Sequence, residues 1–131
     1  SRKQNQCKEK NLRILNLTQH AATPEQLAVG VFEPADKKKV IALLTFEALP
    51  SRGEMIQRVD DMIAIARAEH AEAVMLGGAP FLMSLLERDI KFYMRIPVLY
   101  AFSVRESMEE RQLDGSVKKV AIFRHAGFVK M

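Results

Sequence analysis

Short continuous runs of apolar residues recur along the chain, separated by stretches in which apolar residues stand three or four positions apart. The continuous runs cover residues 12–18, 73–76 and 96–104. Runs of this length, bounded by polar or turn residues, are typical of strands inside a parallel sheet that is covered on both faces. We therefore expect buried strands at these three places.

Helix-start signals lie between the apolar runs. Residues 23–26 read Thr-Pro-Glu-Gln and residues 51–54 read Ser-Arg-Gly-Glu, two capping boxes in which side chains satisfy free amides at a helix start. The first helix is expected to end near Gly30, and the second, the longest, near His70. Two further helices are expected over residues 36–45 and 80–90. Helical segments thus alternate with the predicted strands.

The last third of the chain has the pattern of a β-hairpin. Asp114-Gly115 is a strong two-residue turn signal, and the return strand is expected over residues 117–125. Centring the hairpin on this turn places Glu110 opposite Lys119, an opposite-charge pair that favours this register.

The same register places Arg105 opposite Arg124, with His125 beside them. Two like charges across a ladder are unfavourable unless solvent screens them or an anion lies between them. Either the Glu106 carboxylate or a bound phosphate would meet that need. The arginine pair is therefore a candidate ligand contact.

These elements predict an α/β fold, a small Rossmann-like three-layer sandwich with a mainly parallel sheet. The four strands at 12–18, 73–76, 96–104 and 117–125, numbered along the chain, are expected in the order 2-1-3-4. The last strand is antiparallel and forms a C-terminal edge hairpin.

Length and charge limit the remaining possibilities. The 131 residues suit one domain, expected over residues 11–131, and their apolar runs fall short of the ~20 residues of a membrane helix. Residues 1–10 carry four basic residues against one acidic residue, so +3 of the net +4 lies on a tail expected to be disordered. We therefore expect no groove for duplex nucleic acid and no membrane association.

Other composition features bear on location and cofactors. The chain has one cysteine, so no internal disulfide can form, and no signal peptide is visible, which favours the cytoplasm. Its three histidines lie far apart, without the spacing of metal ligands, and we expect neither a metal nor another cofactor.

Ligands of open α/β sheets bind beyond the carboxyl ends of the strands. Amides of Gly77 and Gly78 can approach a ligand there, and the helix that starts at Pro80 adds positive dipole, which suits an anion. Alternatively, a tight strand-to-helix turn needs these glycines for backbone geometry alone. The candidate ligand contacts at the strand ends are Thr18, Gly77, Gly78, Ser103, Arg105 and Arg124.

Two histidines are candidates for proton transfer. His20 follows the first predicted strand in a polar loop, where a general base or a phosphate contact is useful, and His125 lies beside the arginine pair. The alternative for each is a surface histidine without chemistry. Whether the protein is an enzyme stays open.

The segment Asn16-Leu17-Thr18-Gln19-His20, followed by Thr-Pro-Glu-Gln at residues 23–26, resembles the small CARF-like and ring-nuclease-type Rossmann proteins associated with type III CRISPR systems. The small-residue turn at 77–80 and the terminal strand pair fit the same plan, whereas residues 102–124 do not align with that group. The resemblance implies binding of cyclic oligoadenylates, or their cleavage by a metal-independent phosphodiesterase (ring nuclease), with His20 and the glycine turn as contacts. The chain is also similar to uncharacterised bacterial and mobile-element proteins with comparable Gly-Gly-Ala-Pro and His-Ala-Gly-Phe segments.

Two functions follow as hypotheses. The first is binding of a phosphate-bearing small molecule or cyclic nucleotide at the sheet's carboxyl edge, in a homodimer whose second subunit completes the site. The second is a non-enzymatic interaction or dimerisation module of a mobile-element protein, in which the long hairpin mediates dimerisation or docks a partner by adding strands to an exposed edge.

Overall fold

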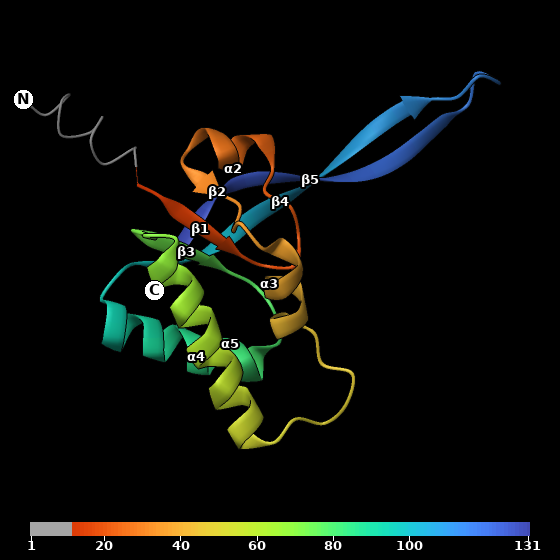
Figure 1. The fold of residues 1–131 in the computed structure, drawn as a ribbon. Helices are drawn as coiled ribbons and strands as arrows, with labels where there is room; N and C mark the ends of the chain where they lie inside the picture. The colour runs from red at the N-terminus through yellow and green to blue at the C-terminus, as the bar shows by residue number, and fades with distance from the viewer. Residues whose placement is uncertain (1–11) are drawn as a thin grey trace, which may run out of the picture.

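A computed structural model describes residues 12–131, so the tail expected at residues 1–10 lies outside the described part of the chain. Figure 1 shows the arrangement of its helices and strands. In chain order they are β1 (Ile14–Leu17), α2 (Pro24–Ala28), β2 (Val31–Phe32), α3 (Lys37–Leu44), α4 (Arg52–Ala68), β3 (Ala73–Leu76), α5 (Pro80–Asp89), the π-helix η1 (Ile90–Met94), β4 (Val98–Arg111) and β5 (Val117–Lys130). None of the helices in residues 12–131 has the length and hydropathy needed to cross a membrane.

The strands form one sheet in the order β2-β1-β3-β4-β5. The first three pairings are parallel and the β4–β5 pairing is antiparallel, which confirms the α/β class and the mainly parallel sheet with an edge hairpin. The first four strands stand in the order 2-1-3-4 when the strands of the structure are numbered along the chain. The second strand in this order is Val31–Phe32, which the sequence pattern did not indicate. Residues 73–76 lie between β1 and β4 instead of at the edge. A two-residue strand is too short for a recognisable period.

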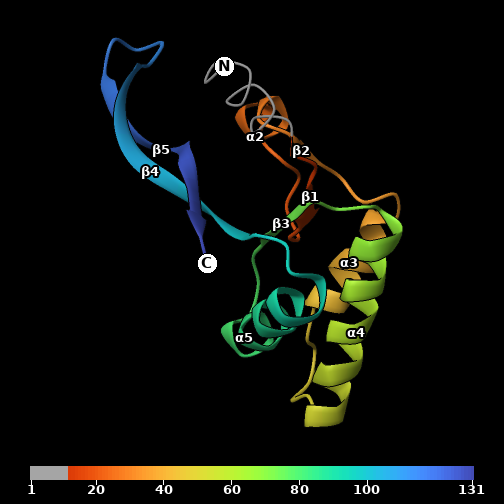
Figure 2. The ribbon, with the colours of Figure 1, turned by 90° about the vertical axis from the view of Figure 1, so that its left-hand side faces the viewer.

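One face of the sheet carries the main core. Helices α3, α4 and α5 cover this face (Figures 1 and 2). Leu15 and Leu17 of β1 and Val74 and Leu76 of β3 point into it, because alternate residues of a strand share a face. Each fully buried leucine contributes about 1.5–3 kcal/mol relative to an exposed one.

The opposite face carries a smaller cluster. It consists of Ile14, Val31, Ala73, Met75 and Leu99, with Ala22 and Phe128 packed against it. Helix α2 lies on this side of the sheet (Figure 1). Burial on both faces explains why β1 and β3 appear in the sequence as continuous apolar runs.

The first capping box forms as expected. Thr23 Oγ1 accepts a hydrogen bond from the Gln26 amide at 3.2 Å, and Gln26 Oε1 accepts one from the Thr23 amide at 3.0 Å. The second forms only in part: Ser51 Oγ accepts from the Glu54 amide at 3.1 Å, whereas the Glu54 carboxylate pairs with Arg58 at 2.8 Å. Both helices begin where the sequence predicts.

Strands β4 and β5 continue far beyond the sheet. The pairing of β3 with β4 ends at Leu76–Tyr100, and from residue 102 onward β4 pairs only with β5. Residues 102–127, called the arm below, project from the body as a twisted two-stranded ribbon (Figures 1 and 2). The expectation that residues 96–104 are buried on both faces is therefore wrong beyond Leu99, since residues 101–105 are exposed.

The hairpin register is shifted by one residue from the expected one. Three residues, 113–115, connect the strands, and the Gln112 amide donates to the Ser116 carbonyl at 2.8 Å. Gly115 has a φ of 87°, the left-handed conformation that such a turn requires. Glu110 consequently pairs with Lys118 instead of Lys119.

This shift also separates the two arginines. Arg105 lies opposite Phe123, and Arg124 lies opposite Val104. A slip of one residue moves side chains to the other face of a ribbon, so the expected Arg105–Arg124 contact is wrong. Arg124 instead pairs with Glu106 at 3.5 Å, the carboxylate named above as one possible neighbour.

Candidate functional site

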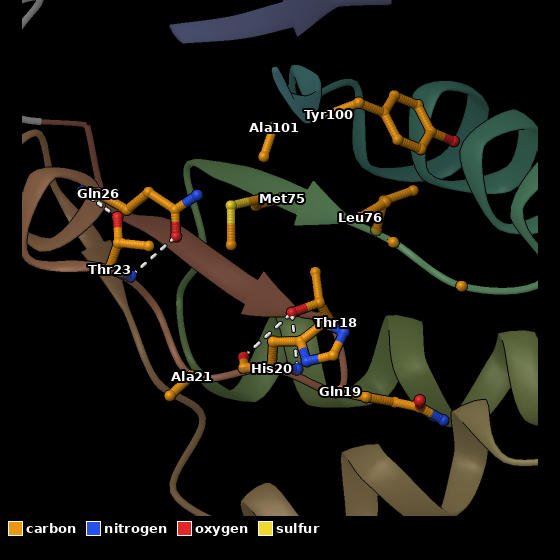
Figure 3. A pocket seen from close by; sticks show the side chains of 12 residues that line it. Thr18, Gln19, His20, Ala21, Thr23, Gln26, Met75, Leu76, Tyr100 and Ala101 are labelled. Atoms are coloured by element: carbon orange, nitrogen blue, oxygen red, sulfur yellow. Dashed lines mark hydrogen bonds between the residues drawn. The ribbon is translucent and has the colours of Figure 1, made fainter. Parts of the chain in front are cut away.

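A pocket of about 440 Å³ opens at the carboxyl ends of β1 and β3 (Figure 3). It lies where open α/β sheets bind ligands, and its volume is within the range of small-molecule sites. The lining comes from the loop after β1, helix α2, the turn after β3 and the start of β4: Thr18, Gln19, His20, Ala21, Thr23, Gln26, Met75, Leu76, Gly77, Gly78, Tyr100 and Ala101.

Four of the candidate residues meet in this pocket. Thr18 and His20 come from the loop after β1, and Gly77 and Gly78 come from a turn about sixty positions later in the chain. Figure 3 shows the His20 ring next to Thr18. Parallel pairing of β1 with β3 brings the two segments together, because Leu17 lies beside Leu76.

A buried asparagine holds the loop that carries His20. Asn16 is fully buried in β1, and its Nδ2 donates to the His20 carbonyl at 2.8 Å and to the Glu33 carboxylate at 2.7 Å. Its Oδ1 accepts from the Thr18 amide at 3.0 Å and from Thr18 Oγ1 at 2.7 Å. Both polar atoms of the Asn16 side chain therefore make hydrogen bonds that hold the loop in place.

Lys37 completes this cluster from helix α3. Its Nζ donates to the Thr18 carbonyl at 2.8 Å and to the His20 carbonyl at 3.0 Å, and it lies 3.3 Å from Glu33 Oε1. The other Glu33 oxygen accepts from the Ala22 amide at 2.9 Å. The sequence pattern singled out none of these three residues as part of a site, although a lone asparagine inside an apolar run is a usable signal.

The two glycines of the turn, Gly77 and Gly78, leave room for close packing of neighbouring side chains. Neither Gly77 nor Gly78 has a positive φ, so neither position requires glycine for a left-handed backbone. A Cβ on Gly77 would lie 3.2 Å from Thr18 Cγ2, and a Cβ on Gly78 would lie 3.2 Å from the Met83 side chain. Gly77 thus allows the turn to approach Thr18 within the pocket, and Gly78 allows it to approach the core.

His125 lies next to the pocket without lining it. Its Nδ1 is 3.4 Å from Gln26 Nε2, and its ring packs edge-on against Phe128. The capping box directs Gln26 Oε1 toward Thr23, so the Gln26 amide group faces His125 as a donor. This arrangement leaves His125 Nδ1 as the acceptor and favours the tautomer protonated at Nε2.

The remaining candidates lie on the arm, outside the pocket. Ser103 pairs with His125, and Arg105 is two residues further along, so both share the face of the arm that carries His125. Arg124 lies on the other face, paired with Glu106. The structure therefore separates Arg124 from the other candidates.

Tyr100 lines the pocket at the start of β4. Burial, and then the neighbouring Glu87 carboxylate, raise the pKa of Tyr100 to about 12. The hydroxyl is accordingly a donor at neutral pH. In Figure 3 its side chain points away from Thr18 and His20, toward the helical layer.

The pocket is lined mostly by apolar surface, and a few polar side chains contribute the rest. None of the described lining residues is an aspartate or a glutamate, while Thr18, Gln19, His20, Thr23 and Gln26 supply polar groups. Within residues 12–131 no group of three His, Cys, Asp or Glu side chains is arranged to hold a metal ion. The pocket thus offers hydrogen bonds and one imidazole as its chemistry.

A protein-family model described as "Uncharacterized protein MJ1673 family" matches residues 12–129. No curated protein and no solved structure matches the chain. The family match spans the body of the domain and the arm, including every candidate residue discussed above. The chain therefore belongs to the uncharacterized protein MJ1673 family.

Proposed function

We propose that the pocket binds a phosphate-bearing nucleotide. The observation that carries this proposal is the convergence of Thr18 and His20 with Gly77 and Gly78 on one pocket whose lining lacks carboxylates. A phosphate placed there meets polar side chains and small residues that let it approach the backbone.

The start of helix α5 supports the phosphate in this proposal. The helix has ten residues and begins at Pro80, directly after the glycine turn, and its N-cap residue Ala79 makes no side-chain hydrogen bond. Pro80 has no amide hydrogen, and the Leu82 and Met83 amides donate to the Ala79 carbonyl at 3.0 Å. The support for an anion at this end therefore comes from the helix dipole and the Phe81 amide. Helix α2 offers no comparable end, because its own capping box occupies it.

Within the class of phosphate-bearing nucleotides, the more specific candidate ligand is a cyclic oligoadenylate. The resemblance of residues 16–20 and 23–26 to CARF-like and ring-nuclease-type proteins supports it. A pocket of about 440 Å³ suits one nucleotide unit better than a whole ring. A second copy of the chain would then complete the site.

Cleavage, if the ligand is a cyclic adenylate, needs no metal. The ligand's 2′-hydroxyl attacks the adjacent phosphorus, the bond from phosphorus to the 5′-oxygen breaks, and a 2′,3′-cyclic phosphate forms. A base takes the proton of the 2′-hydroxyl, and an acid donates one to the leaving 5′-oxygen. His20, which lines the pocket, and His125, which contacts Gln26, are the groups for these two roles.

Isothermal calorimetry with adenosine monophosphate, cyclic tetra-adenylate and unphosphorylated adenosine tests the proposal. We expect binding of the two phosphate-bearing ligands and a loss of at least about tenfold in affinity for adenosine, since a charged hydrogen bond contributes about 1.5–3 kcal/mol. His20→Ala should stop turnover of the cyclic ligand. His70→Asn is the matched control, because His70 lies at the end of α4 and lines no part of the pocket. Absence of both heat and thermal stabilisation with every adenylate would refute the proposal.

The arm supports a second candidate, a non-enzymatic interaction module. It projects from the body, and most of its side chains are exposed. In this case the pocket binds no nucleotide and the arm alone carries the activity. The calorimetric result therefore separates the two candidates.

A further inference from the structure

The two faces of the arm differ in polarity. Side chains alternate between the faces of a ribbon, and directly paired residues share a face. The face called apolar below carries Phe102, Val104, Met108, Val120 and Ile122, together with the charged Glu106, Glu110, Lys118 and Arg124. The polar face carries Ser103, Arg105, Ser107, Glu109, Arg111, Val117, Lys119, Ala121, Phe123 and His125.

The apolar face is largely open to solvent. Phe102 is 54% exposed, Val104 42% and Met108 50%. A two-stranded ribbon by itself is at best marginally stable in water, and a sheet with one apolar face normally buries that face. Exposed apolar side chains gathered on one face in this way mark an interaction site.

Charges on the apolar face point to a second copy of the same chain as its occupant. Glu106 and Arg124 lie 3.5 Å apart near the middle of the face, and Glu110 pairs with Lys118 toward the tip. Each acidic side chain thus lies beside a basic one, so a copy related by a twofold axis can present its arginine to Glu106 and its glutamate to Arg124. Isologous interfaces require this kind of self-complementarity.

We propose that two copies of this chain pack the apolar faces of their arms against each other around a twofold axis near Glu106 and Arg124. The two ribbons then form a small sandwich, with Val104 and Ile122 in its interior and the sheets about 10 Å apart. Addition of strands to an edge would leave the apolar face exposed, which is why face packing is the favoured geometry. The proposal does not depend on nucleotide binding.

Two neighbouring residues of β5 provide a matched pair of variants. Ile122 lies on the apolar face and Phe123 on the polar face. In sedimentation velocity at micromolar concentrations, we expect the wild type and Phe123→Lys to be dimers and Ile122→Lys to be a monomer. Far-ultraviolet circular dichroism and thermal unfolding establish that each variant is folded. A monomeric wild type, or an Ile122→Lys variant that stays dimeric, would overturn the proposal.

Charge reversal tests the twofold arrangement itself. Glu106→Lys and Arg124→Glu each place like charges across the interface, and each should raise the dimer dissociation constant by about 100-fold. When the two variants are mixed, the lysine introduced in one chain meets the glutamate introduced in the other, and the unchanged Arg124 and Glu106 meet as well. We expect a heterodimer to form in the mixture. A mixture that stays monomeric would overturn the twofold geometry, because the single variants alone do not distinguish contacts within one arm from contacts between two arms.

Discussion

Replacing Asn16 by leucine tests the claim that a buried polar cluster holds the pocket loop. Leucine has the same branched arrangement of side-chain heavy atoms, although its methyl groups make it larger, and it makes none of the four hydrogen bonds that Asn16 makes with His20, Glu33 and Thr18. The substitution therefore removes polar contacts without opening a cavity.

The size of the destabilisation follows from the hydrogen bonds that each partner of Asn16 loses. A neutral hydrogen bond contributes about 1 kcal/mol and one to a charged group about 1.5–3 kcal/mol. Glu33 and the His20 carbonyl keep their bonds to Lys37, while the Thr18 amide loses its acceptor. Burial of the leucine offsets part of the loss. We expect a net decrease of about 2–3 kcal/mol in the free energy of unfolding, or roughly 10 °C in melting temperature.

Urea and thermal unfolding followed by circular dichroism measure this change. Gln57→Leu is the matched control, because Gln57 is an exposed amide on α4 whose side chain donates to Asp61 on the same helix. That control should shift stability by no more than about 0.5 kcal/mol. An Asn16→Leu variant as stable as the control would show that the cluster does not hold the loop.

Three further predictions concern other parts of the molecule. Tyr100 should ionise near pH 12, and its contribution to stability, complete below pH 10, should be lost as the pH rises through 12. A tyrosinate absorbance titration in which Tyr100→Phe leaves the high-pH step unchanged would contradict this. Thr23→Ala should cost about 1 kcal/mol in urea unfolding and Thr23→Ser much less, because serine retains the capping hydroxyl. Gly115→Ala should lower the free energy of unfolding by about 1–2 kcal/mol and speed amide exchange at the arm tip, because φ is 87° at this position. Gly53→Ala in helix α4 should cause no loss of stability. Equal exchange rates at the arm tip in the two variants would count against the argument.

Local signals in the sequence predicted the elements well. Thr23 and Ser51 mark the starts of α2 and α4, and the apolar run at 73–76 coincides with β3. Each of these signals acts within about four residues along the chain. The position of a candidate site at the carboxyl ends of the strands followed from the fold class alone.

The hairpin shows what such local signals do not predict, namely the strand register. Asp114-Gly115 located the turn, but three residues, 113–115, connect the strands instead of two. One extra residue moved Arg124 to the face opposite Arg105. Register is specified by packing against a buried face, and the arm has no such face within a single chain.

The chain's own pattern thus determined an α/β domain, its helix starts, its central strands and the general location of a pocket. Only the tertiary structure decided that Asn16, Glu33 and Lys37 hold the His20 loop, that Gly77 lies against Thr18, and that Arg124 pairs with Glu106. The physical reason is the range of the interactions. Caps and periodic apolar positions are stabilised between near neighbours in sequence, whereas these contacts depend on strand order and register, which arise when distant segments compete to bury the same surface.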